Sequence, residues 1–470
     1  MRGSVLIIIL AALVAAAVVA LAGQAIFQPN QPLIVDATFD LDTITPNADG
    51  DTDITGYRYE LSENATVSIT FTGEDGTQFA FRDGEMRARG EYSGLFSGVV
   101  EGYVLDGETF GGEVARRLMP DGTYTWELIA IAENGETDMR DGTLTIADAD
   151  AELPDMPIFT ISPDVFSPNQ DGIRDRTQIN VVLEKDALLE VYLETPDGAQ
   201  IFIPAQIGET RTGEAGRFTF DYDGGIDAGS EPPPDGEYRV VATAQDAVGQ
   251  RVEREATLTI TEGGSPLAEI AAQSIGADVI FTVLTYDEAM LTDMDVTGAL
   301  LAMPDNPADP NRNDITMPVG DVLVFRLIVE NYGDVPIRTH GALPGVVYDQ
   351  TQRAASLGNF DQSGAWRVGI DCDTAVSDYP WRWRIGDADT LDEVYDEETD
   401  NTYFYLPPGE RATVWGGIRM TELIDSRNPQ NCWAGLIHED VGIAVRNARV
   451  GARSIELVDP EAPLYQNDES

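Results

Sequence analysis

Two short acidic loops contain the residues whose types and spacing could do chemistry. In each loop, asparagine and aspartate stand two positions apart, beside a glycine that permits a sharp turn. Closely spaced carboxylate and amide oxygens are the ligands that Ca²⁺ prefers. Neither loop has the residues of an EF-hand, so two interpretations stay open: a weak Ca²⁺ site, or a turn whose side chains accept local backbone hydrogen bonds. The candidate residues are Asn47, Asp49, Asp51 and Asp53 in the first loop, and Asn169, Asp171 and Asp175 in the second.

Tryptophan is concentrated in the C-terminal part of the chain, where five of the six residues lie. Trp381 and Trp383 alternate with arginine, which places both rings on one side of a strand. Two interpretations stay open: an exposed platform that stacks on sugars or peptides, or a sandwich core in which tryptophan packs against a disulfide. We expect Trp433, which follows Cys432, in the core, and Trp381 and Trp383 are the rings that a ligand platform would expose.

Catalytic motifs are not found in the sequence, which has no nucleophile elbow, zinc-binding motif or phosphate-binding loop. The only histidines are His340 and His438, and we expect His438 to lie exposed in a turn after a strand. Paired carboxylates could act on glycosides, but the 82 acidic residues make any one pair uninformative. The sequence therefore indicates a protein that is not an enzyme and has no cofactor besides Ca²⁺. A secreted glycoside-acting enzyme is a remaining alternative.

A tandem repeat positions the two acidic loops. Three strings recur in the same order, which is typical of two copies of one module. The copies of the first string are 122 residues apart and those of the other two are 114 apart, so the first copy has eight extra residues in its middle. The strings are S/T-P-N-x-D-G-x-x-D at 45–53 and 167–175, P-D-G-x-Y at 120–124 and 234–238, and T-L-T-I at 143–146 and 257–260.

Both copies alternate apolar and polar residues as half-buried strands do. In 65–71, Val67, Ile69 and Phe71 share one face, and 188–193 has a similar pattern. Asp-Gly pairs between such segments indicate turns, because glycine tolerates positive φ. Short strands, frequent turns and the lack of a long amphipathic helix predict an all-β fold of sandwich domains.

The repeated unit resembles the FlgD-type immunoglobulin-like domains and the related gliding-motility-type modules of bacterial surface proteins. Those domains open with F-S-P-N-x-D-G-x-x-D and close with a P-D-G-x-Y strand followed by A-x-D-x-x-G. The second copy matches at 166–175, 234–238 and 244–249, whereas the first departs at Ile44 and 132–135. The resemblance implies tandem immunoglobulin-like β-sandwiches in an extracytoplasmic setting. It implies neither flagellar hook capping nor sorting for secretion.

The region after the repeat resembles, over short stretches, bacterial surface β-sandwiches of the CARDB kind. Residues 319–333 match a V-x-N-x-G strand of those folds, and 406–414 match their later strand with its P-G-E turn. The length of this region suits a single sandwich with insertions.

An uncharged apolar run at 5–22 follows Arg2 and precedes an acidic chain. Its length suffices to cross a bilayer as a helix, and the charge before it places the N-terminus inside and the remainder outside. We therefore expect a transmembrane helix that anchors a single-pass cell-membrane protein with an extracytoplasmic C-terminal part. The alternative is a cleaved signal peptide ending at 20–22 and a secreted chain.

The two cysteines of the chain, Cys372 and Cys432, lie in the same region. An even cysteine count in an exported chain indicates a disulfide between them. Free buried thiols are the alternative.

The composition is strongly acidic, with 82 aspartates and glutamates against 29 lysines and arginines and a formal net charge of −53. Such a surface repels nucleic acid phosphates, so we expect no nucleic-acid partner. Two interpretations of the charge stay open. One is a GC-rich genome that favours arginine over lysine, with selection for solubility; the other is a surface adapted to salt or to cations.

These patterns predict a non-catalytic, membrane-anchored protein of the bacterial envelope, whose immunoglobulin-like modules act as spacer and as binding or assembly scaffold. Its expected partners are the membrane, through the N-terminal segment, and envelope proteins or glycans. The alternative is a carbohydrate- or peptide-binding accessory protein that uses the third-region aromatic residues. The expected parts are a membrane anchor or signal segment at 1–27, a first module at 33–148, a second module at 157–262, a third region at 264–458 and a flexible tail at 459–470.

Overall fold

The computed structural model describes residues 31–460 apart from a few short gaps. The expected membrane segment at 1–27 and residues 461–470 of the expected tail lie outside the described residues. Within the described part of the chain, no helix is long and apolar enough to span a membrane. The gaps are 106, 109, 209, 274–275, 295–297, 306–313 and 398.

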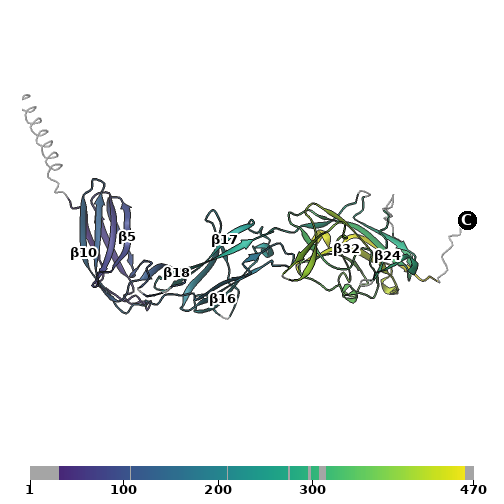
Figure 1. Cartoon of the computed structure of the whole chain (residues 1–470), viewed down its shortest axis with the longest axis horizontal. Helices are drawn as coiled ribbons and strands as arrows, with labels where there is room; N and C mark the ends of the chain where they lie inside the picture. Colours follow the sequence, from purple (N-terminus) through teal and green to yellow (C-terminus); the bar gives the residue numbers. More distant parts are fainter. Residues whose placement is uncertain are drawn as a thin grey trace, which may run out of the picture. The chain divides into compact units, whose positions relative to one another are not determined.

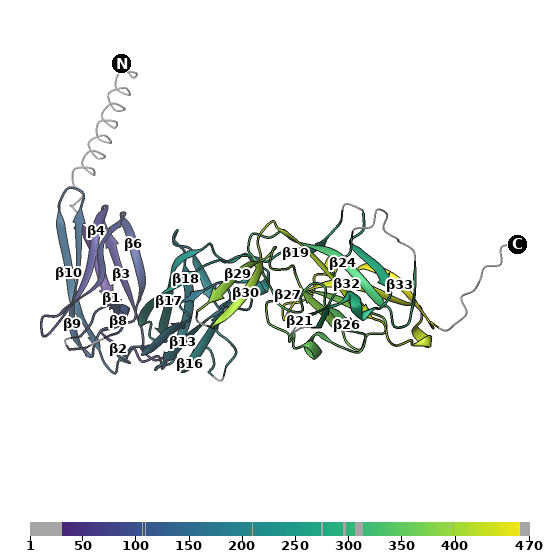
Figure 2. The same ribbon diagram turned by 45° about the vertical axis from the view of Figure 1, so that its right-hand side comes forward.

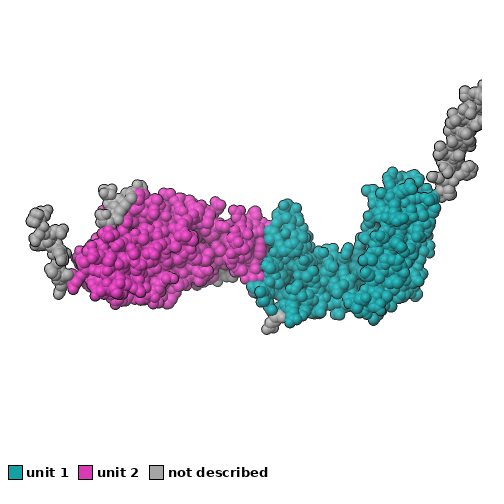
Figure 3. All heavy atoms as spheres, turned by 180° about the vertical axis from the view of Figure 1, so that it is seen from behind, with its two compact units in different colours: residues 1–160, 179–220, 239–257 teal, residues 161–178, 221–238, 258–470 magenta. Residues whose placement is uncertain are grey.

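Strands dominate the described residues, whose only helical segments are five short 3-10 helices (Figures 1 and 2). The prediction of an all-β chain with several sheets is therefore confirmed. The chain forms two compact units, which Figure 3 colours separately. Unit 1 comprises 1–160, 179–220 and 239–257, and unit 2 comprises 161–178, 221–238 and 258–470. The second module thus supplies residues to both units.

The first module forms two sheets, with strand orders β1-β3-β6 and β2-β10-β9-β4-β5. Val67, Ile69 and Phe71 of β4 are 1%, 2% and 0% exposed, so the predicted apolar face packs in the core between the sheets. The strands are β1 (Ile34–Phe39), β2 (Thr43–Ile44), β3 (Thr55–Leu61), β4 (Ala65–Gly73), β5 (Gln78–Arg87), β6 (Gly90–Phe96), β9 (Gly122–Ala132) and β10 (Thr137–Ile146).

Two further strands of the first module, β7 (Val99–Glu101) and β8 (Glu113–Leu118), pair with each other, and β8 also pairs with the second module. Strand β18 (Arg251–Ile260) pairs with β8 in antiparallel orientation, and Val252 lies opposite Val114 in this pairing. The resulting sheet has the order β15-β14-β17-β18-β8-β7. These strands lie in the stretch where the first copy of the repeat is longer.

Gln250 fixes the segment between the two modules. Its buried side chain donates hydrogen bonds to the carbonyl oxygens of Asp150 (3.1 Å) and Glu152 (2.7 Å) and accepts one from the backbone N–H of Leu118 (3.3 Å). Met156 is also buried. This segment is therefore packed against its neighbours in unit 1.

The second module repeats the arrangement of the first, including a short strand directly before the acidic loop. As β2 pairs in parallel with β10, β12 pairs in parallel with β18. The elements are β11 (Ile158–Ser162), β12 (Val165–Phe166), β13 (Thr177–Leu183), β14 (Ala187–Glu194), β15 (Gln200–Ile203), β16 (Gly216–Tyr222), η1 (Ile226–Ala228) and β17 (Gly236–Asp246), followed by β18.

The third region has one large apolar core between two main sheets. One sheet has the order β19-β24-β31-β26 with β20 paired to β24, and the other has the order β23-β33-β32-β27-β25-β30-β29 with β28 paired to β27. The elements are β19 (Ala268–Ala271), β20 (Val279–Leu284), η2 (Glu288–Met290), β21 (Thr292–Met294), β22 (Gly298–Leu300), β23 (Ile315–Pro318), β24 (Val322–Asn331), β25 (Ile337–Thr339), β26 (Val347–Asp349), η3 (Ala354–Leu357), β27 (Trp366–Cys372), β28 (Trp381–Arg384), β29 (Asp392–Asp396), β30 (Asn401–Leu406), β31 (Arg411–Arg419), η4 (Asp425–Arg427), β32 (Gln430–His438), η5 (Val445–Asn447) and β33 (Val450–Val458).

Candidate functional site

The first acidic loop follows β2 and is held by its own side chains. The Asp53 carboxylate accepts hydrogen bonds from the backbone N–H groups of Asn47 (3.0 Å) and Gly50 (2.8 Å). Asn47 Oδ1 accepts from the N–H of Asp49 (3.0 Å), and Asp49 Oδ1 accepts from that of Asp51 (2.8 Å). Desolvation acts in the opposite direction, but these bonds favour the charged form and hold the pKa of Asp53 below its usual value.

The second acidic loop, after β12, has the same hydrogen-bond pattern. Asp175 accepts from the backbone N–H groups of Asp171 (3.0 Å) and Gly172 (2.7 Å). Asn169 Oδ1 also accepts from Asp171 (3.0 Å), and Asp171 Oδ1 accepts from Ile173 (2.8 Å). The repeated string therefore encodes a tight turn in which the carboxylate at its last position satisfies the backbone donors.

Side-chain oxygen atoms of six of the seven residues predicted to bind Ca²⁺, all except Asp51, thus accept backbone hydrogen bonds. Among the residues that the structure describes, no group of three or more His, Cys, Asp and Glu side chains is arranged to hold a metal ion. Ca²⁺ binding by the two loops stays a prediction, which calorimetric titration of the full chain at millimolar Ca²⁺ checks.

The surroundings of the two loops differ, because the second one lies against the third region within unit 2. Asn169 and Asp171 are only 4% and 6% exposed, whereas in the first loop the corresponding Asn47 is half-buried and Asp49 is exposed. The hydroxyl group of Tyr405 donates a hydrogen bond to Asp171 Oδ2 (2.9 Å). Nε2 of His438 donates to the carbonyl oxygen of Gln170 (2.7 Å).

Arg338 of β25 connects the second acidic loop to the segment before β27. Its guanidinium donates to the carbonyl oxygens of Asp171 and Ser363 and to Gln362 Oε1 (3.1 Å). The backbones also approach closely, since a Cβ atom on Gly364 would lie 2.1 Å from the carbonyl carbon of Asp171. We call this cluster of Asp171, Arg338, Tyr405 and His438 the loop joint.

Burial shifts the pKa values of two groups of the loop joint, Asp171 and His438, in opposite directions. Burial, and then the charge of Asp175, raise the pKa of Asp171 to about 6. Burial lowers the pKa of His438 to about 4. Between pH 4 and 6 the folded chain therefore keeps a proton on Asp171 that the unfolded chain loses, so this group makes folding less favourable as pH rises. Between pH 4 and 6.5 His438 does the reverse, because only the unfolded chain binds its proton.

These opposing effects predict that the stability of two single variants depends on pH in opposite ways, relative to the parent chain. Relative to the parent chain, Asp171→Asn should gain stability as pH rises from 4 to 6, by about 3 kcal/mol at most. His438→Gln should gain stability relative to the parent as pH falls from 6.5 to 4, by a similar amount. Differential scanning calorimetry of the three chains at several pH values measures both differences. Parallel profiles for the two variants would contradict the assignment.

The expectation that His438 is exposed is wrong. His438 ends β32, its ring stacks on Trp366 with centroids 4.3 Å apart, and the buried loop covers it. The local sequence could not reveal this, because the covering loop comes from residues far earlier in the chain.

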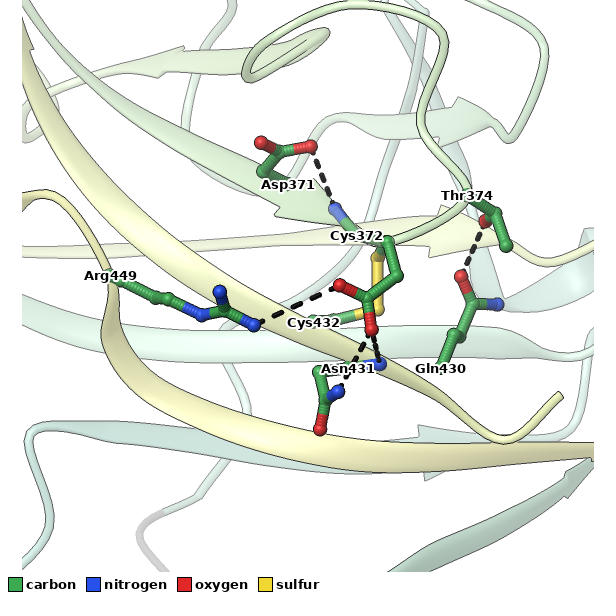
Figure 4. Close-up of a disulfide and its surroundings, with 8 residues drawn as sticks. Asp371, Cys372, Thr374, Gln430, Asn431, Cys432 and Arg449 are labelled. Atoms are coloured by element: carbon green, nitrogen blue, oxygen red, sulfur yellow. Dashed lines mark hydrogen bonds and ion pairs between the residues drawn. A yellow bond between two sulfur atoms is a disulfide. The ribbon is translucent and has the colours of Figure 1, made fainter. Parts of the chain in front are cut away.

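The predicted disulfide joins Cys372 and Cys432, which face each other on β27 and β32 (Figure 4). Both residues are buried. Asp373 secures the neighbouring backbone by accepting hydrogen bonds from the backbone and side-chain nitrogens of Asn431, both at 2.8 Å. Arg449 lies 3.8 Å from the same carboxylate. The bond therefore ties two central strands of the larger sheet in the third region.

The predicted ligand platform at Trp381 and Trp383 is wrong, because these rings are 1% and 0% exposed. The alternation places both on one face, as expected, but β28 packs so that this face lies in the core. Trp433, expected in the core, is half-buried, and the Arg449 guanidinium lies 3.9 Å above its ring. The alternation of residues along a strand predicts which side chains share a face, but the tertiary packing decides which of the two faces is buried.

No protein-family model and no curated protein matches the chain. Among solved structures, it is similar to a tetra-tandem repeat in the extending region of a large adhesion protein, with 14% identity, a TM-score of 0.18, and coverage of 89% of this chain and 72% of that one. It is also similar to a Ca²⁺-stabilised adhesin that helps an Antarctic bacterium to bind ice, with 12% identity, a TM-score of 0.21, and coverage of 90% and 74%. At such values these likenesses assign no family, and they do not show the FlgD-type or CARDB-like resemblance.

Proposed function

We propose that this chain is a non-catalytic, membrane-anchored protein of the bacterial envelope, whose β modules act as a spacer that presents the third region. The observation that carries the proposal is the way in which consecutive segments are joined. In unit 1, β8 continues the sheet of β18. In unit 2, the loop joint buries the second acidic loop against the third region. Joints of this kind restrict rotation between successive segments, as a spacer requires.

An extracytoplasmic location is supported by two features of the chain. The apolar run at 5–22 follows Arg2, which favours export with the N-terminus inside. The bond between Cys372 and Cys432 is of a kind that persists in oxidising compartments and is rare in the cytosol. We further propose that the two copies of the repeat are FlgD-type modules and that the third region is a CARDB-like sandwich.

The proposal is tested by fractionation of cells of the source bacterium, followed by protease treatment of intact spheroplasts. We expect the chain in the membrane fraction, with Met1 retained, and cleavage of its C-terminal part by protease added from outside. We also expect its cysteines to resist alkylation until a reductant is added. A Leu13→Arg, Val14→Arg double variant interrupts the apolar run and should no longer be anchored.

Two results would contradict the proposal. Recovery of the parent chain in the soluble cytosolic fraction would contradict both the membrane anchor and the extracytoplasmic location. A mature N-terminus at Gly23 would replace the anchor by a cleaved signal peptide.

A further inference from the structure

A polar cavity of about 270 Å³ lies in unit 2, where the second acidic loop meets β25 and β30. The second loop contributes Gly172 and Ile173. The third region contributes side chains from both strands and from the segment before β27. The polar and aromatic residues of the lining include Arg338, His340, Gln362, Asn401, Thr402 and Tyr403.

The charge of this cavity differs from that of the chain as a whole. The chain has 82 acidic residues, yet none of the ten described residues that line the cavity is acidic. The lining instead includes a buried arginine and one of the two histidines. The described lining therefore favours an anion over a cation.

Arg338 supplies a buried positive charge whose hydrogen bonds go to neutral groups, while the charges of Asp171 and Asp175 act on it from nearby. It is 4% exposed, and its three hydrogen-bond partners are two carbonyl oxygens and the amide oxygen of Gln362, all of them neutral. Buried charges in proteins are usually paired. The guanidinium has five N–H donors, so a ligand in the cavity could accept hydrogen bonds from those that remain.

His340 adds a second group that suits an anion. Burial lowers its pKa to about 4, and the charges of three arginines act in the same direction. The ring is therefore neutral near pH 7 and offers a hydrogen bond without a charge. The three arginines are Arg367, Arg338 and Arg384.

We propose that this cavity binds a single carboxylate-bearing sugar, such as a uronic acid. Arg338 and His340 meet the carboxylate, and the amide and hydroxyl groups of Gln362, Asn401 and Thr402 bond to the sugar hydroxyls. The ring of Tyr403 gives the sugar an apolar wall. The volume lies below the roughly 300–1,000 Å³ of pockets for drug-sized ligands, so it suits one sugar ring and excludes a longer glycan.

The test is calorimetric titration of the full chain in a polyoxyethylene detergent, which carries no sugar. D-glucuronate and D-galacturonate are expected to give saturable heats. Their neutral parents, D-glucose and D-galactose, should bind at least about tenfold more weakly because they lack the charge that Arg338 meets. Acetate should give no saturable heat, because it lacks the hydroxyl groups.

Variants locate the binding within the cavity. Thr402→Trp, at an exposed position of β30, fills the cavity and should abolish the uronate heats. His340→Ala should weaken binding about tenfold. Thr316→Trp places the same ring on an exposed position of β23 and should leave binding unchanged. The unfolding transition of unit 2 is measured for each variant to establish that it is folded.

Three outcomes would overturn the proposal: no saturable heat with either uronate, equal binding of the neutral sugars, or undiminished binding by folded Thr402→Trp. None of them bears on whether the chain is anchored in a membrane, which the fractionation experiment decides separately.

Discussion

Replacing Trp383 with alanine should destabilise unit 2 by about 4 kcal/mol, within the range of large-to-small substitutions in cores. The ring is fully buried, with centroids 4.6 Å from Phe325 and 5.0 Å from Tyr348. Its Nε1 donates a hydrogen bond to the carbonyl oxygen of Val346 (2.9 Å). Truncation leaves a cavity and removes the donor from that oxygen. Urea unfolding followed by near-ultraviolet circular dichroism measures the loss.

Trp433→Ala is the matched control for this prediction, because it removes the same side chain from another strand of the same sheet. Trp433 is half-buried and contacts Arg449 at the surface. We expect a loss of about 1 kcal/mol, as is usual for a partly exposed site. Equal losses for the two variants would show that Trp383 does not occupy the core position described.

Reduction of the disulfide should destabilise unit 2 by about 4 kcal/mol. The two cysteines are 60 residues apart in the sequence, and the chain-entropy model gives a value between those for loops of about 15 and 100 residues. The bond lies between two buried strand positions, so the reduced thiols keep their packing. Comparison of the oxidised and reduced parent chain by scanning calorimetry measures the difference directly.

Unit 1 provides an internal control, because both cysteines of the chain lie in unit 2. The unfolding transition of unit 1 should not change when reductant is added. In a Cys372→Ala, Cys432→Ala double variant, reductant should change the transition of neither unit. A reductant effect on unit 1, or none on unit 2, would contradict the prediction.

The fold class and the acidic turns could be predicted because both depend on local pattern. Alternating Val67, Ile69 and Phe71 require a half-buried strand wherever it packs. The aspartate that ends each loop string, Asp53 or Asp175, satisfies backbone donors within a few residues of itself. Such interactions need no knowledge of the remaining chain.

The environment of the same elements could not be predicted, because it depends on distant residues. The two acidic loops have one string and one hydrogen-bond pattern, yet only the second is buried, since Arg338 and Tyr405 reach it from the third region. The same holds for His438, whose partner is Gln170. The cavity beside His340 is also formed by segments far apart in the sequence.

The pairing of β8 with β18 has a consequence for where this protein can be divided. A fragment of residues 157–262 alone would lack β7 and β8, and so would carry an open sheet edge at β18. Bare edges recruit strands from other molecules and cause aggregation. Any successful excision or recombination of the second sandwich must therefore take residues 99–118 with it, although they precede the apparent boundary in the sequence.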